Sequence, residues 1–280
     1  MRADGKRLKN VDPMYTVASY VMDKRIDSMN AVTIDIPLSY MQDYLNAKRS
    51  EGHNISHMAL IISAFLRVIG EFPELNRFIV NKKAYARNHF AVSMVVLKGG
   101  QLDHGTMAKL FLDFNDTIFD VNKKIEDFIV ANRETPENNG TEKLIKFLLS
   151  IPGLLGLGVP LIKWADKHGL LPRSIIDASP FHNTFVISNL ASIRTNHIYH
   201  HIYEFGTTGM LITMGNSREV PKRKGGEIVF EKTMPFGIVM DERIASGSYF
   251  ALAFRRLRGI LKNPTELENP PEKIVEDPGL

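Results

Sequence analysis

The chain has 280 residues and a formal net charge of only +4, with basic and acidic residues interleaved, so its charge gives no support for nucleic-acid binding. It contains no cysteine, which excludes disulfides, a cysteine nucleophile and thiolate metal ligands, and agrees with a reducing compartment. With 44% hydrophobic and 24% charged residues, it has the composition of a soluble globular protein that can bury a sizeable core.

The N-terminal residues 1–25 are expected to form an arm. The beginning of this arm is polar and basic and lacks the apolar stretch of a secretory signal. Nowhere does the chain reach the about 18 uninterrupted apolar residues that a membrane-spanning helix needs. These features predict a cytoplasmic protein.

The first half of the chain alternates strands and helices. Residues 32–36 have the apolar–polar alternation of a half-buried strand, and Ser39 is expected to cap the helix that follows. A second, nearly all-apolar helix is expected to begin after Ser56 and to end before Pro73. A hairpin turning at 81–83, a buried strand from Phe90 to Leu97 and an amphipathic helix over 116–133 complete this half.

The second half contains three apolar stretches typical of strands, at 183–190, 209–216 and 226–240, with a turn from Pro221 to Gly226. A final helix is expected from Ser248 to Leu261, followed by an acidic, proline-rich tail over 264–280. Because no linker separates two cores, we expect a single α/β domain over residues 1–280.

An apolar segment from Phe147 to Ile162, broken by prolines and glycines, lies within a longer stretch, 140–179. It is open to three interpretations: an ordinary core hairpin of two short helices, a cover over a long acyl chain, or a shallow membrane contact by residues 147–164. The last is suggested by Lys163 and Trp164 at its end.

The order of these elements resembles the catalytic domain of the 2-oxoacid dehydrogenase acyltransferases, which are relatives of chloramphenicol acetyltransferase. The resemblance covers roughly residues 26–264 and is carried by the short sequences PELN at 73–76 and SNL at 188–190, and by the strand–helix corner at 239–254. Residues 140–179 depart from it as an apolar insertion. It implies a mixed β-sheet flanked by helices, a homotrimer with active sites between subunits, and coenzyme A as a substrate.

The resemblance also implies the roles of individual residues. In the family, the histidine of a His-Arg-x-x-Asp-Gly motif deprotonates the attacking thiol, and the aspartate or an asparagine orders the site. A serine in the SNL-type strand end hydrogen-bonds the oxyanion. The serine corresponds to Ser188, and the arginine and glycine to Arg243 and Gly247, whereas Glu242 stands at the histidine position and Ser246 at the aspartate position.

Replacing histidine by glutamate changes the chemistry of the base. A carboxylate is a weaker base than imidazole by about 2 pKa units, so proton transfer from a thiol becomes roughly 3 kcal/mol less favourable unless burial offsets the difference. Glu242 is therefore either an altered base or a structural residue that pairs with Arg243 or a neighbouring subunit.

A second candidate base follows Ser188 in the sequence. His200 and Glu204 are four residues apart, and a carboxylate that orients a histidine is the usual preparation of a general base. The alternative is that His200 and its neighbours pack at a subunit interface. No helical His-x-x-x-His pair is present, so we expect no metal site.

The sequence shows no lipoyl attachment site, peripheral-subunit-binding domain, P-loop or dinucleotide fingerprint. We therefore expect a stand-alone acyltransferase that acts on acyl-CoA, without a covalently bound lipoyl group and with an unidentified acceptor. The alternative is a catalytically inactive trimeric scaffold on the same fold.

Overall fold

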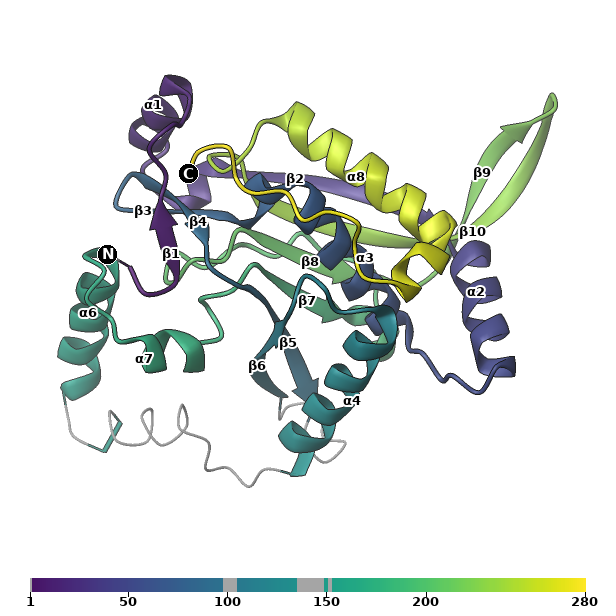
Figure 1. Ribbon diagram of the computed structural model, residues 1–280, viewed down its shortest axis with the longest axis horizontal. Helices are drawn as coiled ribbons and strands as arrows, with labels where there is room; N and C mark the ends of the chain where they lie inside the picture. Colours follow the sequence, from purple (N-terminus) through teal and green to yellow (C-terminus); the bar gives the residue numbers. More distant parts are fainter. Residues whose placement is uncertain (1, 98–104, 135–148, 151–152) are drawn as a thin grey trace.

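The computed structural model describes residues 2–97, 105–134, 149–150 and 153–280, and its centre is a mixed β-sheet (Figure 1). In spatial order the sheet consists of β2 (Met29–Pro37), β10 (Glu227–Asp241), β8 (Met210–Met214), β7 (Phe185–Asn189), β5 (Phe90–Leu97) and β6 (Gly105–Leu112). Strand β7 runs parallel to both of its neighbours, and the remaining pairs are antiparallel. The expected mixed sheet flanked by helices is therefore confirmed.

Four helices pack with the core side chains on one face of this sheet: α2 (Leu38–Ser50), α3 (His57–Glu71), α4 (Ile118–Glu134) and α8 (Gly247–Lys262). Helix α3 is the central one, and nearly all of its side chains are buried. Its predicted cap is confirmed, because the Ser56 hydroxyl accepts a hydrogen bond from the Ala59 backbone N–H at 3.0 Å. The packing of α3 against the sheet places the core where the apolar pattern predicted it.

A smaller sheet and three helices lie beside the main sheet. The small sheet contains β1 (Gly5–Arg7), β4 (Lys83–Arg87) and β3 (Arg77–Val80), and the helices are α1 (Pro13–Val21), α6 (Leu154–Lys167) and α7 (Arg173–Ala178). Short 3-10 turns occur at η1 (Arg25–Ser28), η2 (Pro73–Asn76), η3 (Leu190–Ile193) and η4 (Pro264–Glu268). These parts contain most of the N-terminal arm and the described portion of the insertion.

The acidic tail is docked on the body of the molecule. The Asp277 carboxylate accepts two hydrogen bonds from the Arg77 guanidinium at 2.7 Å, and both side chains are buried. The Val275 backbone N–H donates to the Gly70 carbonyl at 2.9 Å. The tail therefore fixes the end of α3 to the small sheet.

Two predicted boundaries are wrong. Helix α2 begins at Leu38 after Pro37, so Ser39 lies inside the helix and does not cap it. The turn predicted over 221–226 contains only Gly225 and Gly226, and residues 218–224 form an additional strand, β9 (Arg218–Lys224). Both glycines have positive φ, at 60° and 92°, as a two-residue hairpin turn requires.

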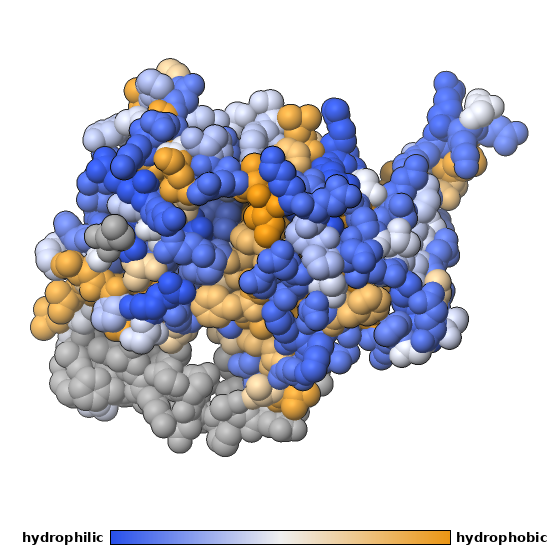
Figure 2. Space-filling view, in the orientation of Figure 1, coloured by the Kyte–Doolittle hydropathy of each residue, from blue (hydrophilic) through white to orange (hydrophobic). Residues whose placement is uncertain are grey.

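The described second half of the apolar segment does not lie in the core. Residues 154–167 form one continuous helix, α6, and its Leu157 and Leu161 side chains are 77% and 63% exposed. Figure 2 shows apolar surface on this side of the molecule. Residues 140–148 and 151–152 of the expected insertion lie outside the described residues.

Candidate active site

Ser188 lies near the end of β7, on the sheet face opposite the four helices. The strand registers place it beside Thr213, Thr213 beside Gly237, and Gly237 beside Thr33, so these residues form one row across four strands. Ser188 is partly exposed, and no hydrogen bond to its hydroxyl occurs within the described part of the chain. The hydroxyl of the predicted oxyanion donor is therefore available to a ligand.

The irregular segment 195–206 crosses this row. The Thr213 hydroxyl accepts a hydrogen bond from the Ile198 backbone N–H and donates one to the Ile198 carbonyl, at 3.1 and 2.6 Å. Gly237 is required at this crossing, because a Cβ there would lie 2.5 Å from the Ile198 carbonyl oxygen and 3.0 Å from the His197 ring. Gly237 is an isolated glycine inside an apolar strand, and such a glycine is a sequence signal for the close approach of another backbone segment.

His197 is the site residue that the sequence analysis missed. Its Nε2 lies 3.0 Å from the Thr33 hydroxyl, and its Nδ1 is buried without a hydrogen-bond partner among the described residues. The ring lies over β10 and reaches towards β2, which is the side away from Ser188. In the single chain, His197 is therefore not positioned as a base for a ligand at Ser188.

Glu242 follows the last residue of β10. Its backbone N–H donates to the Ser28 carbonyl at 2.9 Å, and its carboxylate accepts a hydrogen bond from the Asn30 side chain. No cation pairs with the Glu242 carboxylate within the described part of the chain. The interpretation that Glu242 pairs with Arg243 is therefore wrong.

The structural role belongs to the adjacent carboxylate. Asp241 is 1% exposed and accepts two hydrogen bonds from the Arg243 guanidinium, at 2.8 and 2.7 Å. Arg243 also donates to the Met22 carbonyl at 2.9 Å, and burial opposes its charge while Asp241 raises its pKa. The Asp241–Arg243 pair therefore holds the corner, and Glu242 is not needed for it.

Glu242 lies at a cleft of about 410 Å³ between β2 and α8. The walls of the cleft are mainly apolar and are formed by Val32, Ile34, Met240, Phe250, Ala251 and Phe254. Arg255 and Arg258, both exposed on α8, also line it. The cleft thus combines a carboxylate that is not paired with a cation among the described residues, an apolar wall and two arginines.

Ser246, the other predicted site residue at this corner, caps α8. Its hydroxyl accepts a hydrogen bond from the Tyr249 backbone N–H at 3.2 Å and lies 2.9 Å from the Ser248 hydroxyl. An aspartate would cap a helix equally well at this position. Within the described chain, no hydrogen bond joins Ser246 to Glu242, so Ser246 does not orient that carboxylate.

The structure does not bring His200 and Glu204 together. The segment between them forms neither a helix nor a strand, so no regular repeat places the two side chains on one face. His200 Nδ1 lies 2.8 Å from the His201 carbonyl oxygen, and the Glu204 carboxylate accepts a hydrogen bond from the Arg25 backbone N–H at 2.8 Å. Glu204 therefore orders η1 and not His200.

Ser188 and Glu242 are far apart within one chain. Glu242 lies five residues beyond Gly237, or about 17 Å along the strand direction, and two strand spacings separate Gly237 from Ser188, about 10 Å across the sheet. The resulting separation of roughly 20 Å is too large for both to act on the same bond. Within one chain, Ser188 and Glu242 therefore do not form a single site.

The described residues contain no group of three or more His, Asp or Glu side chains that could hold a metal ion. Among the helices in the described part of the chain, none is long and apolar enough to cross a membrane.

Comparison with known proteins identifies related sequences and structures. Residues 180–268 match the family model of the 2-oxoacid dehydrogenases acyltransferase catalytic domain. A comparison with curated proteins finds no match.

Three solved structures illustrate the shared fold. A probable dihydrolipoamide acetyltransferase from Listeria monocytogenes is 13% identical, with a TM-score of 0.59 over 97% of this chain and 99% of that chain. The Azotobacter vinelandii dihydrolipoamide acetyltransferase, studied for the catalytic roles of a serine, a histidine and an asparagine, is 11% identical, with a TM-score of 0.60 over 93% of each chain.

A chloramphenicol acetyltransferase is 12% identical, with a TM-score of 0.56 over 92% of this chain and 100% of that chain. The resemblance inferred from the sequence is therefore confirmed, as is the chloramphenicol acetyltransferase-like fold in a single domain.

Proposed function

We propose that this protein is a coenzyme A-dependent acyltransferase whose active site forms between two subunits of a homotrimer. Ser188 of one subunit and Glu242 of the next provide the oxyanion donor and the general base. The match of residues 180–268 to an acyltransferase catalytic domain supports the reaction class.

The observation that carries the proposal is that the Glu242 carboxylate has no cation partner among the described residues and accepts a hydrogen bond only from the neutral Asn30 side chain. The neighbours of Glu242 on both sides are committed to structure, since Asp241 and Arg243 bind each other in the interior. Glu242 has no cation partner among the described residues and lies at the mouth of the cleft. If Glu242 only held the corner, its carboxylate would be expected to bind Arg243 as the Asp241 carboxylate does.

The cleft has the chemistry that an acyl-CoA requires. An apolar wall can take the pantetheine arm or an acyl chain, and Arg255 and Arg258 can contact phosphate groups. Cofactor-binding residues could not be named from the sequence, and these two arginines are our candidates.

The proposed reaction begins when the Glu242 carboxylate takes the proton of the acceptor thiol. The thiolate attacks the thioester carbonyl carbon, and the Ser188 hydroxyl donates a hydrogen bond to the resulting oxyanion. The tetrahedral intermediate then collapses, the C–S bond to coenzyme A breaks, and the leaving thiolate takes the proton from Glu242. His200 is the second candidate base in an assembled site, although no carboxylate among the described residues orients it.

The β9–β10 hairpin supports assembly into oligomers. Residues 227–232 of β10 pair only with β9, and the hairpin stands clear of the body of the molecule (Figures 1 and 2). Ile228 and Phe230 are each 68% exposed on one face of the hairpin. Because an isolated two-stranded hairpin is marginally stable in water, we propose that a neighbouring subunit covers this face.

Turnover of acyl-CoA tests the proposal, with thiol release measured for short and long acyl chains over a panel of thiol acceptors. Replacing Ser188 by Ala should lower turnover by about 10²–10³, since it removes one oxyanion donor. The melting temperature should stay nearly unchanged, because the hydroxyl has no partner within the described chain. Destabilisation by Ser188→Ala without consumption of any thioester would favour the inactive scaffold instead.

The absence of cysteine favours a cytoplasmic location for the enzyme.

A further inference from the structure

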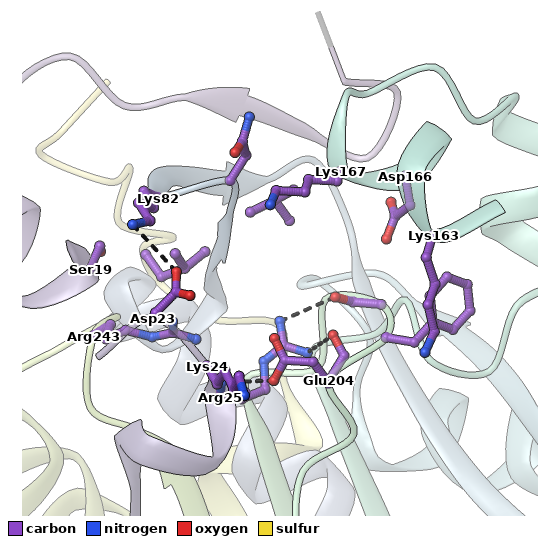
Figure 3. Close-up of a pocket in the computed structure, with 15 residues that line it drawn as sticks. Ser19, Asp23, Lys24, Arg25, Lys82, Lys163, Asp166, Lys167, Glu204 and Arg243 are labelled. Atoms are coloured by element: carbon purple, nitrogen blue, oxygen red, sulfur yellow. Dashed lines mark hydrogen bonds and ion pairs between the residues drawn. The ribbon is translucent and has the colours of Figure 1, made fainter. Parts of the chain in front are cut away.

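A second cleft, of about 320 Å³, lies between α1, η1, the β3–β4 turn and α6 (Figure 3). It shares no lining residue with the cleft at Glu242. Its charged lining residues are Lys24, Lys82, Lys163, Lys167, Arg25 and Arg243, with Asp23, Asp166 and Glu204. Cations outnumber carboxylates two to one in a cleft that is large enough for a small molecule.

The floor of this cleft contains a guanidinium without a carboxylate of its own. Arg25 is 3% exposed and donates to the carbonyls of Tyr203 and Gly206 at 2.6 and 3.1 Å. Its Nε has no hydrogen-bond partner in the described part of the chain and lies 3.7 Å from an Asp241 carboxylate oxygen. That carboxylate already binds Arg243 through two hydrogen bonds. Two buried guanidinium groups therefore share one carboxylate.

The Glu204 carboxylate, which also lies near Arg25, does not contact the Arg25 guanidinium. Glu204 accepts its hydrogen bond from the Arg25 backbone N–H and not from the guanidinium. Buried charges are normally paired one to one, and two buried guanidinium groups that share one carboxylate leave an excess of positive charge that attracts an anion from solution.

The rim adds two exposed lysines on a helix that is itself anchored. Lys163 and Lys167 lie one turn apart on α6, and neither pairs with a carboxylate among the described residues (Figure 3). Between them, Asp166 is anchored by Arg2, whose Nη2 donates to its carboxylate at 2.7 Å and whose Nη1 donates to its carbonyl at 2.5 Å. The anchored helix thus presents two free ammonium groups to the cleft.

We propose that this cleft binds a phosphorylated anion, with the phosphate between the α6 lysines and the Arg25 floor. Ammonium and guanidinium groups converging from separate elements are the usual means of phosphate recognition. This binding is independent of acyl transfer, because it uses neither Ser188 nor Glu242.

The phosphate could belong to a free metabolite or to the headgroup of an anionic phospholipid. Helices α1 and α6, which both line the cleft, also carry exposed apolar side chains, including Val17 and Tyr20 on α1 and Leu161 and Trp164 on α6. Apolar side chains beside a cationic site are typical of binding at a lipid surface. The experiment therefore needs one probe for each source.

Binding should be measured on the full chain with inorganic pyrophosphate by titration calorimetry, and with phosphatidylcholine vesicles, with and without phosphatidylinositol phosphate, by sedimentation. The test variant is Lys163→Glu with Lys167→Glu, and the charge-matched control is Lys6→Glu with Lys273→Glu, which are exposed lysines outside the cleft. We expect the test variant to weaken binding by at least about tenfold and the control by less than about twofold. Unchanged melting temperatures would show that both variants fold.

Lysine-dependent binding of pyrophosphate would support the site and identify a soluble ligand. Lysine-dependent binding of only the anionic vesicles would support the site and identify a lipid headgroup. Failure of the wild-type protein to bind either probe, or an equal loss in the test and control variants, would overturn the proposal.

Discussion

Two adjacent carboxylates at the strand–helix corner have opposite environments. Asp241 is buried and bound to Arg243, whereas Glu242 is partly exposed and contacts only neutral groups among the described residues. Side chains at such corners can be positioned accurately because both elements are rigid. The contrast separates the residue that maintains the corner from the residue that is available for chemistry.

Replacing each carboxylate by its amide should affect turnover at Glu242 and stability at Asp241. Glu242→Gln removes the proposed base and should lower thioester turnover by about 10²–10⁴ while leaving the melting temperature nearly unchanged. Asp241→Asn leaves a buried arginine without its carboxylate and should lower the free energy of unfolding by about 3–5 kcal/mol. Denaturant unfolding and turnover should both be measured for each variant. Equal destabilisation by the two substitutions would show that Glu242 is structural.

His89 should make the protein sensitive to acid. Burial lowers the pKa of this imidazole to about 3, and the nearby cations Arg87, Lys109 and Arg173 add to this effect while Asp4 opposes it. Neither ring nitrogen has a hydrogen-bond partner within the described part of the chain. The folded state therefore resists protonation at a position where the unfolded chain accepts it.

Between pH 6.5 and pH 3 the unfolded state binds a proton at this position and the folded state does not. The free energy of unfolding should therefore fall by up to about 1.4 kcal/mol per pH unit as the pH decreases through this window, from this residue alone. His89→Phe should remove that part of the slope and leave the slope above pH 6.5 unchanged. Urea unfolding at several pH values measures both slopes, and identical slopes for the two proteins below pH 6.5 would contradict the assignment.

At the scale of elements, the β9–β10 hairpin is the feature that the single chain does not explain. Its strands extend beyond the sheet, and Lys222 and Glu231 form an exposed ion pair across them. Exposed ion pairs contribute little stability, so the hairpin lacks a core of its own. A covering partner would supply one.

Charges on the apolar face of this hairpin should prevent assembly without unfolding the chain. Ile228→Glu with Phe230→Glu should convert the trimer to smaller species in light scattering at micromolar concentration, because both side chains are exposed in the isolated chain. Val229→Glu, a single charge on the opposite face, is the control and should have the smaller effect, and Ile228→Glu alone is its charge-matched counterpart. Equal assembly of all four proteins would exclude this face from the interface.

Local signals predicted most of the elements. The Ser56 cap, the hairpin predicted to turn at 81–83 and the strands containing Ser188 and Val239 were confirmed because each depends on neighbouring residues. The turn itself contains Asn81 and Lys82, and Lys83 begins β4. The additional strand β9 was missed because Pro221 and the charged residues around it resemble a turn. Pro221 is tolerated there because β9 pairs only with β10 and lies at an edge.

The site was predicted less completely, because its contacts are tertiary. Arg25 and Asp241 are separated by most of the chain, and nothing in the sequence indicated that Arg243 would pair with Asp241 instead of Glu242. The expected pairing of His200 with Glu204 is wrong for the same reason, since the Glu204 carboxylate accepts a hydrogen bond from the Arg25 backbone N–H. Residue types and spacing identified candidates, but the fold determined their partners.

At the scale of the whole molecule, the account depends on assembly. One chain holds Ser188 and Glu242 roughly 20 Å apart on the same sheet. Neither the cleft at Glu242 nor the end of β7 at Ser188 is therefore a complete active site. We propose that the Glu242 cleft of each subunit faces the Ser188 row of its neighbour, and cyclic symmetry would then make the three sites of a trimer equivalent. The function we propose therefore belongs to the trimer and not to the chain.

Complementation between inactive variants tests this claim most directly. Ser188→Ala and Glu242→Gln chains are prepared separately, mixed in equal amounts, dissociated and reassembled, and acyl-CoA turnover is compared with that of each parent. If the two residues meet across an interface, random mixing should restore about a quarter of the wild-type activity, because that fraction of sites combines an intact Ser188 with an intact Glu242. Reassembled mixed trimers that are no more active than either parent, while reassembled wild-type protein regains its turnover, would contradict the two-subunit site.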